Sequence, residues 1–173
     1  SKLAAVGVQI QNIITQAGNI LEGASTDLSS SDAAKEVFKT IANKIIAADG
    51  ESETTFDLTN TDDLKSVITD TAQQLTQNTG VTIDTTKVTS NVDAAASQIV
   101  QSNSKIDDAI SAGKTGDDLF AVTSQTQKEA TDFAETAKTA IENNQPVEDI
   151  NYTPIPDADV TLSTDEDTPI EIT

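Results

Sequence analysis

Apolar residues recur at intervals of three and four along most of the chain before Asn144, the spacing that places them on one face of an α-helix. The first such stretch runs from Lys2 to Leu21, and Gly23 with the Ser/Thr/Asp cluster behind it predicts its end. Its expected inward face consists of Leu3, Val6, Ile10, Ile13, Ile14, Ala17, Ile20 and Leu21. A first amphipathic helix is therefore predicted.

Two more helices are predicted from similar start signals. Leu28 before Ser29, with Asp32 three residues on, resembles a hydrophobic staple and capping box, and Gly50 is a natural stop. That helix is expected to bury Ala34, Val37, Phe38, Ile41, Ala42, Ile45 and Ile46. The series Leu58, Thr59 and Asp62 repeats the start signal, and the next helix is expected to bury Leu64, Val67, Ile68, Ala72 and Leu75 before Gly80 closes it.

The fourth and fifth helices are the longest that the pattern predicts. Val81 and Ile83 are expected to cross the end of a bundle in extended form, and a helix then begins near Asp84 or Thr85. Its heptad stripe is Val88, Val92, Ala95, Ile99, Ser102, Ile106 and Ala109. After Gly113, a capping box of Thr115 and Asp118 opens a stripe of Leu119, Val122, Thr126, Ala130, Phe133, Ala137 and Ala140. The short turn between them predicts an antiparallel helical hairpin.

The helical signal stops at Asn144. Pro146, Pro154, Pro156 and Pro169 disfavour any further helix. Residues 145–173 carry eight acidic residues and no basic one, and the pairs Val160/Leu162 and Ile170/Ile172 alternate with polar residues, as in strands. The sequence therefore predicts an all-α antiparallel bundle of about five helices in residues 1–144. An acidic, proline-containing linker with the first strands of a truncated β-domain follows in residues 145–173, and the chain is interpreted as a piece of a longer protein.

Composition narrows the possible chemistry. The formal charge is −19, which disfavours nucleic acid and anionic membranes as partners because both require clustered basic residues. The chain has no Cys or His, so a Ser-His or Cys-His nucleophile pair cannot be assembled within it, nor a zinc or copper site with nitrogen or sulfur ligands. No apolar run approaches the roughly 18 residues of a membrane span.

Acidic residues of the tail are the only candidate metal ligands with some support. Carboxylates suit Ca²⁺, which takes six to eight oxygen ligands in tolerant geometry. The candidates are Asp157, Asp159, Asp165, Glu166 and Asp167. A solvated acidic linker is the favoured interpretation of these residues, because no spacing matches a complete calcium loop. The loop from Asp49 to Asp57 also lacks the order of an EF-hand and is interpreted as solvated.

Neighbouring carboxylates also occur in the helical part, at 62/63, 107/108 and 117/118. At predicted helix starts, Asp62, Asp117 and Asp118 complement the helix dipole without any catalytic partner. Ser102, within an apolar stripe, is expected to bond to the backbone or set the helix register. Neither feature predicts an enzyme.

Two resemblances suggest a setting. The segment VTLSTDEDTPIEI, residues 160–172, resembles the opening strand of cadherin-like or immunoglobulin-like repeats in large bacterial surface proteins. The segments VQIQNIITQAGNILEG, DAAKEVFKTIANKI and LTNTDDLKSVI are similar to helical regions beside such repeats and beside haemolysin-type calcium repeats in secreted adhesins. The resemblance implies an extracellular or cell-surface location, calcium dependence carried by residues 165–167, and an adhesive or architectural role.

Three functions remain open on the sequence. The first is a non-enzymatic structural or interaction module of an adhesin-like protein, whose partners are neighbouring domains of the same polypeptide and another protein or surface ligand. The second is a phasin-like protein of granule or lipid surfaces, suggested by AVTSQTQKEATDFAETAKTA. The third, an enzyme that uses only carboxylates, is weakest because aromatic residues, which sugar sites commonly use, make up 3% of the chain.

Overall fold

The computed structural model describes residues 2–50 and 55–147, and this part of the chain contains five α-helices. Their number and order confirm the prediction. They are α1 (Lys2–Gly23), α2 (Ser30–Gly50), α3 (Thr61–Asn78), α4 (Thr85–Ser111) and α5 (Gly116–Glu142).

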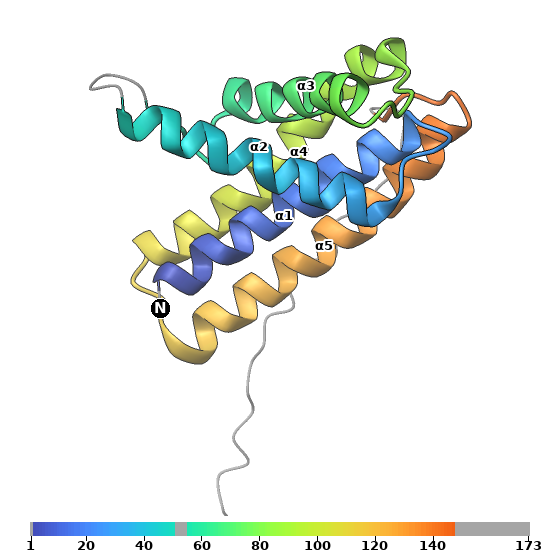
Figure 1. Ribbon diagram of the computed structural model, residues 1–173. Helices are drawn as coiled ribbons and strands as arrows, with labels where there is room; N and C mark the ends of the chain where they lie inside the picture. The colour runs from blue at the N-terminus through green and yellow to red at the C-terminus, as the bar shows by residue number, and fades with distance from the viewer. Residues whose placement is uncertain (1, 51–54, 148–173) are drawn as a thin grey trace, which may run out of the picture.

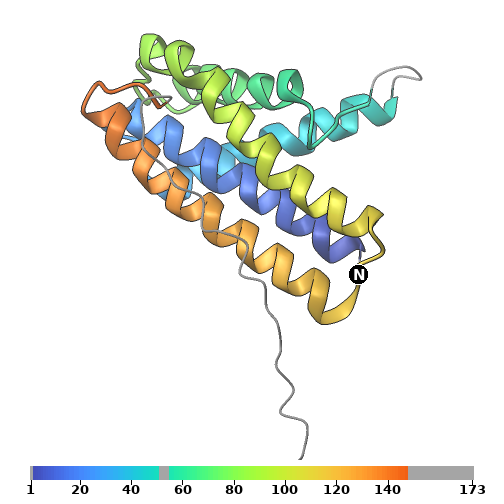
Figure 2. The ribbon, with the colours of Figure 1, turned by 180° about the vertical axis from the view of Figure 1, so that it is seen from behind.

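The helices form two layers (Figures 1 and 2). In one layer α1 lies between α4 and α5 and contacts both, so the predicted α4–α5 hairpin is present with α1 packed along it. The second layer consists of α2 and α3, which cross the first layer on one side: α2 packs on α1, and α3 packs on α4. The amino end of α1 lies beside the α4–α5 turn, so α1 runs parallel to α5 and antiparallel to α4.

Side-chain caps fix the starts of three helices. The Ser29 hydroxyl accepts the Asp32 N–H at 3.1 Å, which is the N-cap half of the predicted capping box, and it donates to the Asp32 carboxylate at 2.7 Å. Asp84 caps α4 by accepting the N–H groups of the second and third helical residues. The cap of α3 is Asn60, whose Oδ1 accepts two backbone N–H groups, and the prediction of Thr59 was wrong.

The predicted capping box at Thr115 was also wrong, because Thr115 makes no side-chain hydrogen bond to the first turn of α5. Two helix ends follow a different rule. At Gly113 (φ 79°) and Asn144 (φ 58°) the chain turns left-handed, and the next N–H bonds back to Ala109 O and Ala140 O. These are Schellman ends, in which glycine or asparagine accepts a backbone conformation that other residues avoid.

The core confirms most of the predicted stripes. Every predicted inward residue of α3 and α4 is buried, as are those of α5 except Val122, which is half-buried. In α1 the prediction was wrong for Leu3 and Val6, which are exposed, and in α2 for Phe38, Ile45 and Ile46. These residues share a helical spacing with the core positions, but no other helix covers their side of the described structure.

Two short connections close the same end of the bundle. Ile83 is buried and forms an isolated antiparallel bridge with Ser25, which confirms that this segment crosses in extended form. At the end of α5 the chain folds back, and Val147 packs in the main core while its N–H donates to Asn91 Oδ1 at 2.8 Å. Packing of the bundle therefore reaches beyond the predicted boundary at residue 144 as far as Val147.

Candidate functional site

The predicted calcium ligands Asp157, Asp159, Asp165, Glu166 and Asp167 lie outside the described residues, as do 51–54 of the acidic loop after α2. Within residues 2–50 and 55–147, no three His, Cys, Asp or Glu side chains come together in a group that could hold a metal ion. The described part of the chain therefore offers no metal centre to build on.

The paired carboxylates have structural partners. Asp63 follows the Asn60 cap, and its carboxylate accepts the Asp57 N–H at 2.9 Å. Asp107 Oδ1 accepts Nε2–H of Gln9 at 2.7 Å. Asp117 and Asp118 lie in the first turn of α5, where negative charge is favourable next to the free N–H groups. These carboxylates hold loops, helices and helix ends in place.

A buried polar layer separates two apolar clusters in the bundle. The larger cluster draws on all five helices, and the smaller one consists of Ala5, Ile106, Ala109 and Leu119 near the amino end of α1. Between them α1, α4 and α5 bury polar side chains: Gln9, Asn12, Ser102, Asn103, Thr123, Thr126 and Glu129. Sequence periodicity missed the α1 members because glutamine and asparagine do not count as apolar.

Asn103 is the centre of this layer. Its Nδ2 donates to Leu58 O at 2.8 Å, its Oδ1 accepts from Asn12 Nδ2 at 3.3 Å, and its carbonyl accepts from Gln9 Nε2 at 3.1 Å. One side chain thus ties α4 to α1 and to the loop before α3. Ser102 donates to Gln98 O, as expected of a backbone-bonded serine. Buried polar groups of this kind fix the register of packed helices.

Two buried carboxylates add ion pairs across helices. Glu129, on α5, lies 2.8 Å from Lys105 Nζ on α4, and Glu22, on α1, lies 2.7 Å from Lys138 Nζ on α5. The hydrogen bond to Glu22 raises the pKa of Lys138, against the opposing effect of desolvation. Both pairs tie α5 to the rest of its layer.

Two clefts lie at the end of the bundle where α5 stops, with volumes of about 340 and 640 Å³. Asp84 and Lys87 line both. The carboxylate of Asp84 already caps α4, and the other carboxylate of the larger cleft, Glu142, is exposed to solvent. The residues that line the two clefts do not specify a reaction or a ligand.

Three of the six large apolar side chains that are exposed in the described residues lie on α2. Phe38 is 56% exposed, Ile45 42% and Ile46 70%. We call the strip of Lys35, Phe38, Lys39, Ala42, Ile45, Ile46 and Asp49 the α2 outer face. Its apolar centre lies between lysines near its start and an aspartate at its end. A contiguous apolar surface with a charged rim is a typical docking surface.

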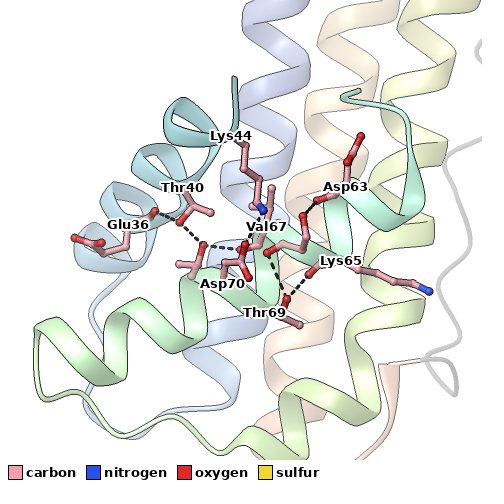
Figure 3. A network of polar contacts seen from close by, with 10 residues as sticks. Glu36, Thr40, Lys44, Asp63, Lys65, Val67, Thr69 and Asp70 are labelled. Atoms are coloured by element: carbon pink, nitrogen blue, oxygen red, sulfur yellow. Dashed lines mark hydrogen bonds and ion pairs between the residues drawn. The ribbon is translucent and has the colours of Figure 1, made fainter. Parts of the chain in front are cut away.

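The opposite face of α2 is held against α3 by a polar network (Figure 3). The Thr40 hydroxyl donates to Glu36 O at 2.9 Å and lies 2.9 Å from the Thr71 hydroxyl of α3. Lys44 Nζ lies 2.6 Å from Asp70 Oδ2. These contacts orient α2 so that its second apolar stripe points away from the bundle.

Comparisons with known proteins add no family. No protein-family model matches this chain, no curated protein matches its sequence, and no solved structure matches it. Among the described helices, none is both long enough and apolar enough to cross a membrane. The described part of the chain is therefore defined by its fold alone, a five-helix bundle, and a function is inferred from the residues themselves.

Proposed function

We propose that this chain is a non-enzymatic structural module of a bacterial cell-surface protein, placed between neighbouring domains and leading through its acidic tail into a β-rich repeat. The sequence resemblance of residues 160–172 to the start of such repeats supports the setting. In this role the module bears tension between its neighbouring domains. The observation that carries the proposal is the path of the described chain, which enters the bundle at one end and leaves it at the other.

That path runs from one end of the bundle to the other (Figure 2). At one end Ala5 packs near Leu119 at the start of α5. At the other end Gly23 lies against the backbone of Lys138 and against Ile141 near the end of α5. Because the two helices are parallel neighbours, tension between residues 2 and 147 slides α1 along α5. When α1 is pulled lengthwise past α5, many side-chain contacts are loaded at the same time. When α1 is instead pulled away from its neighbours starting at one end, the contacts break one after another.

Single-molecule force spectroscopy tests this role. The chain has no native cysteine, so the pair Lys2→Cys and Gln145→Cys gives two unique attachment points at opposite ends. The control pair, Lys2→Cys and Lys114→Cys, lies at one end and peels α1 from its neighbours. We expect the first pair to unfold at a higher force at the same loading rate. Equal or lower force for the first pair would contradict a tension-bearing role.

Calcium association of the acidic tail is the second part of the proposal. Titration calorimetry with Ca²⁺ on residues 1–173 should give heat that residues 1–147 do not give, because the carboxylates at 157, 159 and 165–167 are missing from the shorter chain. The shorter chain ends at 147 so that the buried Val147 is kept. Equal binding by both would remove the tail from the proposal without affecting the bundle.

The alternative of a granule- or lipid-surface protein rested on residues 121–140 of α5. In this fold the apolar residues of that segment face α1 and α4, and Phe133, Ala134 and Ala137 are buried. Binding a lipid surface through them would require the bundle to open. Cosedimentation with lipid or polyester particles at temperatures where the bundle is folded provides the direct test.

A further inference from the structure

We propose that the α2 outer face is a self-association surface, on which α2 of one copy pairs antiparallel with α2 of a second copy about a twofold axis at Ala42. The inference goes beyond the structural role proposed above and does not depend on it, because a bundle that bears tension as a monomer remains possible if it fails.

The first step is the layout of the face. Its central positions are Lys35, Phe38, Ala42, Ile45 and Asp49, which alternate steps of three and four. This is the spacing of a coiled-coil seam, here directed away from the bundle. Helices that belong to a packed core do not need a second seam on the outer side, and α2 is held to α1 and α3 by its other face. The outer seam is therefore available for another helix.

The second step is that the face is complementary to itself. Lys35 and Asp49 lie equally far from Ala42, one on each side, and so do Phe38 and Ile46. In a twofold pair centred on Ala42, each Lys35 ammonium approaches the Asp49 carboxylate of the other copy, and each Phe38 ring approaches the other copy's Ile46. Lys39 meets the other copy's Ile45, where its aliphatic stem packs on the isoleucine and its ammonium stays in water. The small side chain of Ala42 lets the helices approach at the axis. One surface thus meets an identical one with opposite charges in register, as twofold interfaces require.

The third step concerns the other possible occupants. The chain has a net charge of −19, whereas the strip itself carries two exposed lysines and one aspartate, so it does not share the overall excess of negative charge. A lipid surface would match the apolar centre and the lysines but would place Asp49 against it. A second copy satisfies both ends of the strip.

Sedimentation equilibrium over a concentration series tests the proposal, with the chain of residues 1–173 expected to show a reversible monomer–dimer equilibrium. Phe38→Ser should weaken the dimer at least tenfold, since a buried aromatic anchor is lost from the centre of a small interface. Phe120→Ser is the matched control, because Phe120 is 71% exposed on α5, away from this face. A chain that stays monomeric to about 1 mM, in the range of very weak affinity, overturns the proposal, as does equal weakening by the two substitutions.

Charge exchange tests the register. Lys35→Asp and Asp49→Lys should each weaken the dimer about tenfold, because each places like charges at two symmetry-related contacts, and the double variant should recover. Lys114→Asp makes the same change in net charge as Lys35→Asp on an exposed residue outside the face. If that control weakens the dimer as much, or the double variant does not recover, the antiparallel register is wrong.

Cross-linking tests the axis directly. In a chain without native cysteine, Ala42→Cys places two thiols opposite each other across the twofold axis, so mild oxidation should give a disulfide-linked dimer. Thr131→Cys, at an exposed position of α5, should stay monomeric. No cross-linking at 42, or binding of neutral vesicles that Phe38→Ser abolishes in a chain that remains monomeric, overturns the proposal in favour of another occupant.

Discussion

Gly23 allows α1 and α5 to approach each other closely, and replacing it tests that contact. A methyl group at Gly23 would lie 2.9 Å from the Lys138 carbonyl oxygen, 3.0 Å from Ile141 Cβ and 3.2 Å from Lys138 Cα. Two of these neighbours are backbone atoms, so no flexible side chain can move aside. The ends of the helices must separate, and the nearby Glu22–Lys138 pair must be strained.

We expect Gly23→Ala to lower the free energy of unfolding by up to about 2 kcal/mol. Overpacking of a tight contact costs about 1–3 kcal/mol. Alanine recovers up to about 1 kcal/mol of that by restricting the unfolded chain. For a protein of this size each kcal/mol lowers Tm by about 2–4 °C.

Two further glycines of the same helix provide controls. A methyl group at Gly7 meets nothing within 4 Å, and at Gly18 it would lie 3.8 Å from Ala33 Cβ, an ordinary contact. Both substitutions by alanine should therefore stabilise the bundle by about 0.5–1 kcal/mol, the helix-propensity difference. Urea unfolding followed by circular dichroism at constant m measures all three. The close-approach argument is refuted if Gly23→Ala is as stable as Gly7→Ala.

The remaining predictions concern the polar layer, a helix cap and pH. Asn103→Leu should cost about 1–3 kcal/mol, because Leu58 O loses its donor in a buried site, and urea unfolding measures the loss. Asn60→Ala should cost about 1 kcal/mol, whereas Thr115→Ala should be close to neutral because no side-chain cap bond is lost. The raised pKa of Lys138 means that its contribution is fully present below its ordinary value of 10.5 and is lost as pH rises through the folded-state pKa. The urea concentration at the midpoint of unfolding should therefore fall as pH rises through that alkaline range, and it should fall less steeply in Lys138→Met. Equal pH slopes in the two proteins would contradict the assignment of this effect to Lys138.

The sequence alone determined the number, order and approximate ends of the helices. Apolar spacing and caps such as Asp84 are local properties, and they act within a few residues whatever the partner helix is. Every residue of the heptad predicted for α4 is buried, and because this helix contacts α1, α3 and α5 its buried face also includes Asn91, Ala96 and Asn103 beside that stripe.

Only the tertiary structure decided which of two apolar stripes α2 buries. Val37 and Ile41 turn inward while Phe38 and Ile46 turn outward, although neighbouring positions have almost the same hydrophobicity and spacing. The polar side of α1 was equally hidden from periodicity, since Gln9 and Asn12 are buried by pairing with Asn103 of a distant helix. Gly23 illustrates the same distinction: its sequence position predicted a helix end near it, and the backbone of α5 decided that no side chain fits there. Local periodicity places residues on a helix face, and long-range packing selects the face that is covered.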